Sequence, residues 1–178
     1  MILGMSTATF TQLHVLISLL AIGSGMVVVW GFWNAKSLAR WTAFFLATTA
    51  LTSLTGFLFP FKGVTPGIVV GVLSIILLAV AVAARYSLHM RGAWRPIYVI
   101  TAMVALYFNV FVLAVQSFEK VPALRALAPT QKEPPFAIVQ LILLVLFVGA
   151  TVFAVKRFRP DSAVASSNAP RTIQKRVA

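Results

Sequence analysis

The sequence predicts an all-α integral membrane protein: a bundle of five transmembrane helices with the amino terminus outside and the carboxyl terminus in the cytoplasm. Composition points to the class, because 60% of the residues are hydrophobic and 10% are charged, whereas soluble domains carry about 25% charged residues. The mean hydropathy of +0.96 agrees. The lengths of the apolar runs and the distribution of lysine and arginine predict the number of spans and their orientation.

Five apolar runs are each long enough to cross the membrane, since roughly 20 helical residues span about 30 Å of hydrocarbon. Each run is bounded by a charge, a proline or both, and most of the tryptophans lie near the expected ends, as in the aromatic belts of membrane proteins. The first run lacks the basic n-region of a secretory signal peptide, so we expect a retained helix. In chain order the predicted spans are 13–33, 41–61, 67–86, 96–118 and 136–155.

Basic residues are distributed unequally between the alternate connections. Eleven of the fifteen lie on one predicted side and four on the other, so the positive-inside rule places the first side in the cytoplasm. This alternation also favours five spans over four. The larger set is Lys36, Arg40, Arg85, Arg91, Arg95, Lys156, Arg157, Arg159, Arg171, Lys175 and Arg176, and the smaller set is Lys62, Lys120, Arg125 and Lys132.

The chain is expected to end in a disordered basic cytoplasmic tail, residues 160–178, after a transmembrane domain at 1–159. The tail is rich in serine, alanine and proline and has no apolar periodicity. Its lysines and arginines are expected to lie against the anionic headgroups of the lipid bilayer. This explains the net charge of +12 without a nucleic-acid partner.

The longest outer connection, EKVPALRALAPTQKEPPF at 119–136, is predicted to contain a short helix. Pro122 is suited to a helix start, and Val121, Leu124 and Leu127 recur at near-helical spacing. The segment is either a lid over the outer end of the bundle or a connector that lies in the membrane interface.

Polar side chains are concentrated in the middle and outer half of the predicted spans. Asn109 and Gln116 lie two turns apart on one helix face, and we expect both to be paired inside the bundle because an unpaired polar group in lipid is unfavourable. This polarity predicts either an outward-opening ligand cavity or interhelical hydrogen bonds in a packed bundle. The candidate ligand-binding residues are His14, Ser18, Thr52, Asn109, Gln116, Glu119, Gln131 and Gln140.

His14 begins the first predicted span and has two interpretations. Its imidazole either reaches interfacial water or meets Glu119 or Gln116 across the bundle, as a titratable group near neutral pH. His89 lies in a connection on the other side of the membrane, so the two histidines cannot ligate one haem iron.

Residues for catalysis are scarce, which favours a non-enzymatic protein. The chain has no cysteine and three carboxylates, Glu119, Glu133 and Asp161. No phosphate loop, metal-binding motif or catalytic triad is present in the sequence. No catalytic residue, metal site or specific cofactor is predicted.

Three stretches resemble uncharacterised small multi-pass proteins of the bacterial inner membrane. They are HVLISLLAIGSG at 14–25, TSLTGFLFPF at 52–61 and YFNVFVLAVQSFEKVPALRALAPTQKEPPF at 107–136. The resemblance covers residues 13–159 and implies a location in the bacterial cytoplasmic membrane. It carries over no activity and no catalytic residues.

We interpret the sequence as a non-enzymatic membrane protein that binds a small ligand, or docks a membrane-protein partner, through its polar outward-facing half. Two alternatives stay open. One is a redox subunit that binds a haem through a single histidine, or a quinone through His14, Asn109 and Gln116. The other is a scaffold or assembly subunit of a larger membrane complex, which would present a small-residue face such as Gly67 and Gly71 to a partner helix.

Overall fold

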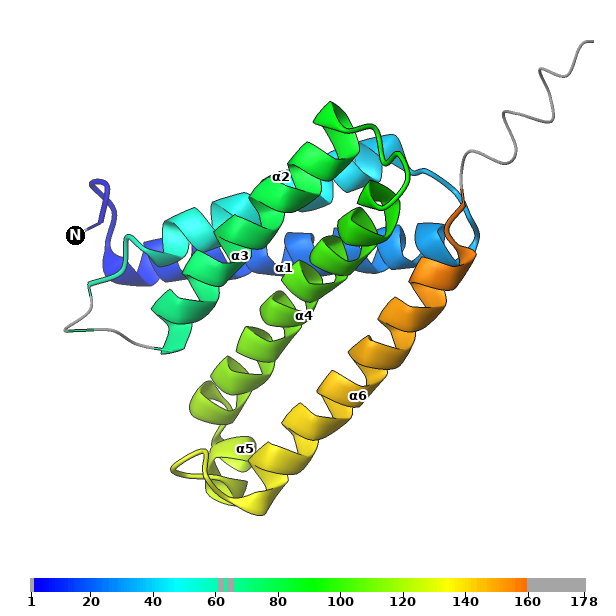
Figure 1. The fold of residues 1–178 in the computed structure, drawn as a ribbon. Helices are drawn as coiled ribbons and strands as arrows, with labels where there is room; N and C mark the ends of the chain where they lie inside the picture. Colours follow the sequence, from blue (N-terminus) through cyan, green and yellow to red (C-terminus); the bar gives the residue numbers. More distant parts are fainter. Residues whose placement is uncertain (1, 61–62, 64–65, 160–178) are drawn as a thin grey trace, which may run out of the picture.

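The computed structural model describes residues 2–60, 63 and 66–159, which form an all-helical fold (Figure 1). An isolated bridge between Ile2 and Met5 is the β structure within these described ranges. The predicted tail, 160–178, lies outside them. The elements are α1 (Thr7–Trp33), α2 (Ala39–Gly56), α3 (Pro66–Val82), the π-helix η1 (Ala83–Ser87), α4 (Trp94–Lys120), α5 (Pro122–Leu127) and α6 (Pro134–Arg157).

Each predicted apolar run contains a helix, and local cap and proline signals mark the starts of three helices, α1, α5 and α6. Helix α1 begins at Thr7 because the Ser6 side chain accepts a hydrogen bond from the Thr9 backbone N–H at 3.1 Å. Prolines occupy the first turns of α5 and α6, where a missing N–H is tolerated. The short helix expected near Pro122 is confirmed as α5.

Within the described residues, four helices are long and apolar enough to cross a membrane, and they indicate a multi-pass membrane protein. These are α1, α3 continued through η1, α4 and α6. Helix α2 has 18 residues, a length of about 27 Å, and it is less apolar because it contains Arg40 and several threonines. It ends at Gly56 rather than at residue 61, since glycine weakens a helix and Pro60 disfavours helical backbone before it.

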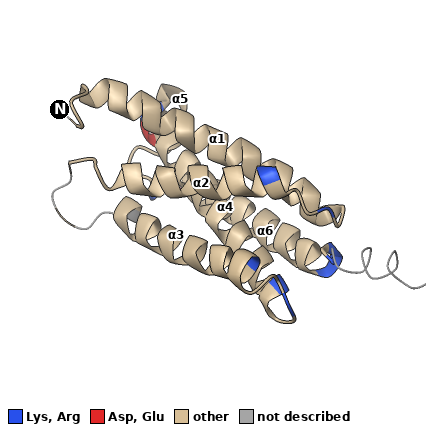
Figure 2. Ribbon diagram, turned by 90° about the horizontal axis from the view of Figure 1, so that it is seen from above, with Lys and Arg blue, Asp and Glu red and all other residues tan. Residues whose placement is uncertain are grey.

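The helices pack most tightly at the end that carries most of the described basic residues, here called the basic end (Lys36, Arg40, Arg85, Arg91, Arg95, Lys156, Arg157 and Arg159). In Figure 2 most of the ribbon coloured for lysine and arginine lies at one end of the bundle. The main cluster of buried side chains lies in the same half. In Figure 1 the helices converge there, and α4 and α6 diverge from α1 and α2 toward the opposite end.

Hydrogen bonds at the basic end attach α6 to α1 and α4. Arg95 donates to the backbone carbonyls of Val155 and Phe158. The Trp33 indole N–H donates to the Ala150 carbonyl at 3.4 Å, and Arg157 Nε donates to the Trp33 carbonyl at the same distance. The carbonyls of Trp33, Val155 and Phe158 lie at helix ends and have no partner within their own helix, so the bonds to them also cap α1 and α6.

The small-residue face of α3 is partly used inside the chain. A Cβ atom built on Gly71 would lie 3.0 Å from the ring of Phe57, so this glycine makes room for the residue that follows α2. Gly67 is exposed. The expectation that Gly71 faces a partner helix is therefore wrong, because Phe57 already occupies that position.

Candidate functional site

The eight predicted site residues do not share one cavity: five lie in three helix interfaces, two line a pocket beside a loop, and one is exposed. His14 belongs to the interface of α1 and α2, where its Nδ1 lies 2.8 Å from the Thr55 hydroxyl. The Thr55 hydroxyl proton is directed at the Leu51 carbonyl, 2.7 Å away, so the Nδ1–H of His14 donates in this pair. Of the two interpretations of His14, the pairing with Glu119 or Gln116 is wrong, since α4 has diverged from α1 at that level (Figure 1).

Ser18 and Thr52 lie on the same interface of α1 and α2. The Ser18 hydroxyl donates to the His14 carbonyl at 2.8 Å within its own helix. The Thr52 hydroxyl is buried and has no hydrogen-bond partner in the described chain. This part of the interface therefore contains one unpaired polar group close to the His14–Thr55 pair.

Asn109 and Gln116 have different environments although they share one face of α4. Asn109 is buried, and its side-chain amide donates to the Thr49 hydroxyl of α2 at 3.2 Å, which confirms that it is paired in the bundle. Gln116 is exposed, and no hydrogen bond of its side chain is found among the described residues. The expectation for Gln116 is wrong, because α4 leaves α2 before reaching it (Figure 1).

Gln140 lies in the interface of α4 and α6, between two aromatic contacts. The rings of Phe118 and Phe136 are 5.4 Å apart on one side of it, and those of Tyr107 and Phe147 are 5.5 Å apart on the other. Both polar atoms of the Gln140 side chain are buried without a partner in the part of the chain that the structure describes. Burying an unsatisfied amide is unfavourable by about 1–3 kcal/mol.

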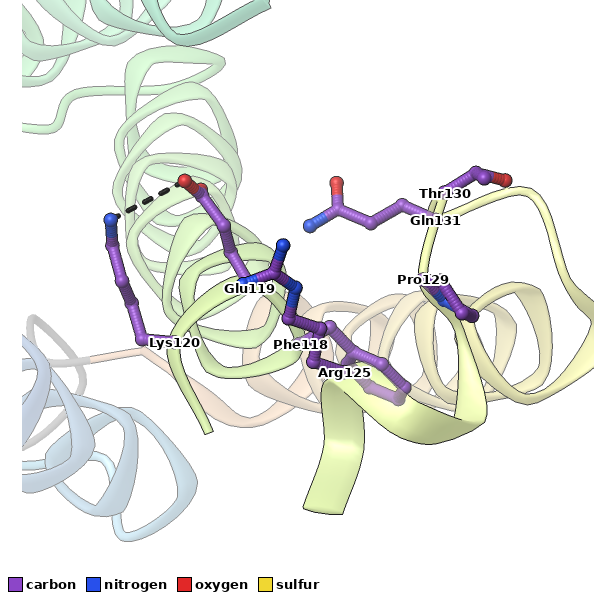
Figure 3. A pocket seen from close by; sticks show the side chains of 7 residues that line it. All are labelled: Phe118, Glu119, Lys120, Arg125, Pro129, Thr130 and Gln131. Carbon is purple, nitrogen blue, oxygen red and sulfur yellow. Dashed lines mark hydrogen bonds and ion pairs between the residues drawn. The ribbon is translucent and has the colours of Figure 1, made fainter. Parts of the chain in front are cut away.

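A pocket of about 450 Å³ lies at the opposite end, between the last turn of α4 and the loop after α5 (Figure 3). Glu119 forms an ion pair with Lys120 at 3.3 Å. The Gln131 amide reaches from the loop and donates to the Val115 carbonyl at 3.1 Å. The pocket is lined by Phe118, Glu119, Lys120, Arg125, Pro129, Thr130 and Gln131.

Two lining residues were predicted, Glu119 and Gln131, whereas Arg125 was missed as a site residue. Its sequence signal is a basic residue on the predicted short helix. The guanidinium of Arg125 has no hydrogen-bond or ion-pair partner within the described ranges, and Figure 3 shows it directed into the pocket.

Glu133 orders the loop that borders the pocket. Its carboxylate accepts hydrogen bonds from the Thr130 backbone N–H and hydroxyl, at 3.2 and 2.9 Å, and from the Lys132 N–H at 3.0 Å. Desolvation acts to raise the pKa of Glu133, but backbone and Thr130 hydrogen bonds together hold the pKa below its usual value. The ionised carboxylate of Glu133 therefore contributes fully to loop order above about pH 4.3, the usual glutamate pKa. This contribution is lost as the pH falls through the lowered pKa of Glu133 in the folded protein.

Arg85 is the second residue that sequence reasoning missed. It lies in η1 at the basic end, is only 8% exposed and donates to the Tyr98 and Ser37 hydroxyls, both at 3.3 Å. Its guanidinium also lies 5.2 Å from the centre of the Tyr98 ring. The ion pair found in the described chain is Glu119–Lys120, so the charge of Arg85 is buried among neutral partners.

No protein-family model, curated protein or solved structure matches this chain. Among the residues that the structure describes, no three His, Cys, Asp or Glu side chains are grouped so that they could hold a metal ion. The pocket at the opposite end is therefore the candidate site with the clearest geometry, because it combines volume, charge and an ordered loop.

Proposed function

We propose that the chain is a non-enzymatic integral membrane protein that binds a small polar ligand at the end opposite the basic end. The observation that supports this most strongly is the pocket of about 450 Å³ with a charged and polar lining. Its volume is within the range of ligand sites, about 300–1,000 Å³. The packed basic end supplies a rigid base for the helices that carry it.

The lining favours a ligand with an anionic group. Lys120 already pairs with Glu119, whereas the Arg125 guanidinium has no partner among the described residues and suits a carboxylate or phosphate through two parallel hydrogen bonds. The Thr130 hydroxyl and Gln131 amide supply neutral hydrogen-bonding groups, and Phe118 supplies an apolar surface. A polar segment of a partner protein would use the same groups.

The site is testable by replacing Arg125 with glutamine together with Gln131 with leucine. We expect wild-type protein, purified in mild detergent, to retain about one small anionic molecule per chain, identified by mass spectrometry of an extract. The double variant should retain roughly tenfold less, because a hydrogen bond to a charged group contributes about 1.5–3 kcal/mol. Gln116→Leu is the matched control, since Gln116 is exposed and outside the pocket lining.

Equal retention by wild type and double variant would contradict the ligand site. A protein segment crosslinked at Gln131 in intact membranes would replace the small ligand by a docking partner. A haem Soret band, or a quinone present at one per chain, would instead support the redox alternative and make His14 the next residue to substitute.

We propose further that α2 is a fifth span, with the amino terminus outside and the carboxyl terminus in the cytoplasm of a bacterial cell. Helix α2 packs against α1 and α3 along the bundle (Figure 1), and its length of about 27 Å approaches the hydrocarbon thickness. The distribution of basic residues supports the orientation.

The topology is testable with reporters at the two termini. A reporter fused after Ala178 is expected to be cytoplasmic, and a tag at Met1 is expected to be accessible from outside, because five spans place the termini on opposite sides. Termini on the same side would show an even number of spans. Termini on opposite sides but exchanged would reverse the orientation and place the pocket in the cytoplasm.

A further inference from the structure

A second cavity, an apolar groove of about 470 Å³, lies between α2 and α3. The groove opens on the outer surface of the bundle, as the exposed side chains of Ala43, Ala47 and Ala79 on its walls show. The alanines leave space that larger side chains would fill. The walls are formed chiefly by Ala43, Ala47 and Ala50 of α2 and by Ile75, Ala79 and Val82 of α3.

The groove ends among positive charges at the basic end. Tyr86 lines this end of the groove. Arg40 precedes Ala43 by three residues and Ala47 by seven, so it lies on the same face of α2, about one turn nearer to the basic end. Arg40 is exposed and, within the described part of the chain, has no hydrogen-bond or ion-pair partner.

A buried charge lies behind this end of the groove. The guanidinium carbon of Arg85 is 5.6 Å from the centre of the Tyr86 ring, and the guanidinium donates hydrogen bonds to neutral groups. The two described carboxylates, Glu119 and Glu133, lie at the opposite end (Figure 2). Positive charge at this position is therefore not compensated by the described chain.

We propose that an anionic phospholipid of the adjacent leaflet binds here, with an acyl chain in the groove and its phosphate at Arg40 and the Tyr86 hydroxyl. An apolar groove along the helices, with positive charge at one end, matches the polarity of such a lipid. Guanidinium groups bind phosphate oxygens through paired hydrogen bonds. Basic pockets between transmembrane helices are a known mode of anionic lipid recognition.

A partner helix fits the groove less well than a lipid chain. The groove extends about 16 Å along α3, from Ile75 to Tyr86. Charge distinguishes the two occupants, because an anionic lipid brings a phosphate to Arg40 at the end of its acyl chain, whereas an apolar partner helix matches only the groove walls. The lipid site lies at the other end from the proposed ligand pocket and is independent of it.

The test is lipid retention and thermal unfolding of the full chain in mild detergent. The added probes are dioleoylphosphatidylglycerol, dioleoylphosphatidylcholine and inorganic phosphate. We expect phosphatidylglycerol to raise the midpoint of unfolding and to remain bound at about one molecule per chain in native mass spectrometry. Phosphatidylcholine and phosphate alone should do neither, because one lacks net charge and the other lacks the acyl chain.

Two variants and two controls locate the site. Arg40→Gln should lower phosphatidylglycerol retention roughly tenfold, in line with loss of a charged hydrogen bond, and Ala47→Phe should lower it by filling the groove. Both positions are exposed, so folding without lipid should be unchanged. Lys156→Gln removes one charge at the basic end, and Ala137→Phe adds a ring on the exposed surface of α6; both should retain the lipid.

Three results would overturn the proposal. Equal stabilisation by phosphatidylcholine would show that the headgroup charge is not recognised. An equal effect of inorganic phosphate would indicate a free-anion site without an acyl-chain groove. Equal losses in Arg40→Gln and Lys156→Gln would show a general attraction of anionic lipid to the basic end.

Discussion

Replacing Tyr98 with alanine is expected to lower the free energy of unfolding by about 3–5 kcal/mol, the range for removing a buried aromatic side chain. Tyr98 is fully buried, and its ring centre lies 5.6 Å from that of Phe32 and 6.3 Å from that of Phe158. It therefore joins α4 to the end of α1 and to the residue after α6. The measurement is reversible unfolding in detergent, followed by loss of helical circular dichroism.

Tyr98→Phe separates the ring from its hydroxyl. The phenylalanine keeps the aromatic contacts but removes the oxygen that accepts a hydrogen bond from Arg85, so we expect a smaller loss of about 1.5–3 kcal/mol. If alanine and phenylalanine were equally destabilising, the ring packing would contribute nothing. The convergence of the helices at the basic end would then need another explanation.

Gly25→Leu is expected to destabilise the protein by about 1–3 kcal/mol or more, because it inserts side-chain atoms into a filled core. A Cβ atom at Gly25 would already lie 2.5 Å from Leu106 Cδ1 and 3.0 Å from the Phe45 ring. Both neighbours are 1% exposed, so neither has free space to move into. The same detergent unfolding measurement tests this prediction.

Gly23→Leu is the matched control on the same helix. A Cβ atom at Gly23 meets nothing within 4 Å, so leucine there should be neutral or stabilising by up to about 1 kcal/mol through better helix propensity. Equal destabilisation by the two substitutions would show that the close approach of α1, α2 and α4 at Gly25 does not restrict the core.

The helices could be predicted from sequence because their formation depends on local properties. Apolar runs locate the long helices, and capping residues and prolines mark some of their ends. Even the short α5 follows from Pro122 and the spacing of its leucines. The end of α2 was predicted less well, because the apolar run continues past Gly56 whereas the helix ends there. Apolarity specifies transfer into lipid, whereas glycine and proline govern the helix itself.

The candidate sites were predicted in part, because their residues depend on how the helices diverge. Asn109 and Gln116 have the same helical face and similar chemistry, yet one pairs with Thr49 and the other is exposed. Arg125 and Arg85 carried only general signals, as a basic residue on the predicted short helix and a basic residue at the end of the third predicted span. The pocket beside Arg125 arises where the loop returns to α4, and the burial of Arg85 arises from Tyr98 and Ser37.

The sequence by itself determined an all-helical, multi-pass membrane chain. The free energies of helix formation and of transfer into lipid are each sums of contributions from neighbouring residues, so they can be judged from a local stretch of sequence. Only the tertiary structure decided that the helices converge at the basic end, that Arg85 is buried there and that the predicted polar residues are divided among helix interfaces, a loop pocket and the exposed surface. These features depend on contacts between distant segments, such as Arg85 with Ser37, 48 residues apart. A periodic pattern identifies the face of a helix, but the angle between helices determines which neighbour that face meets.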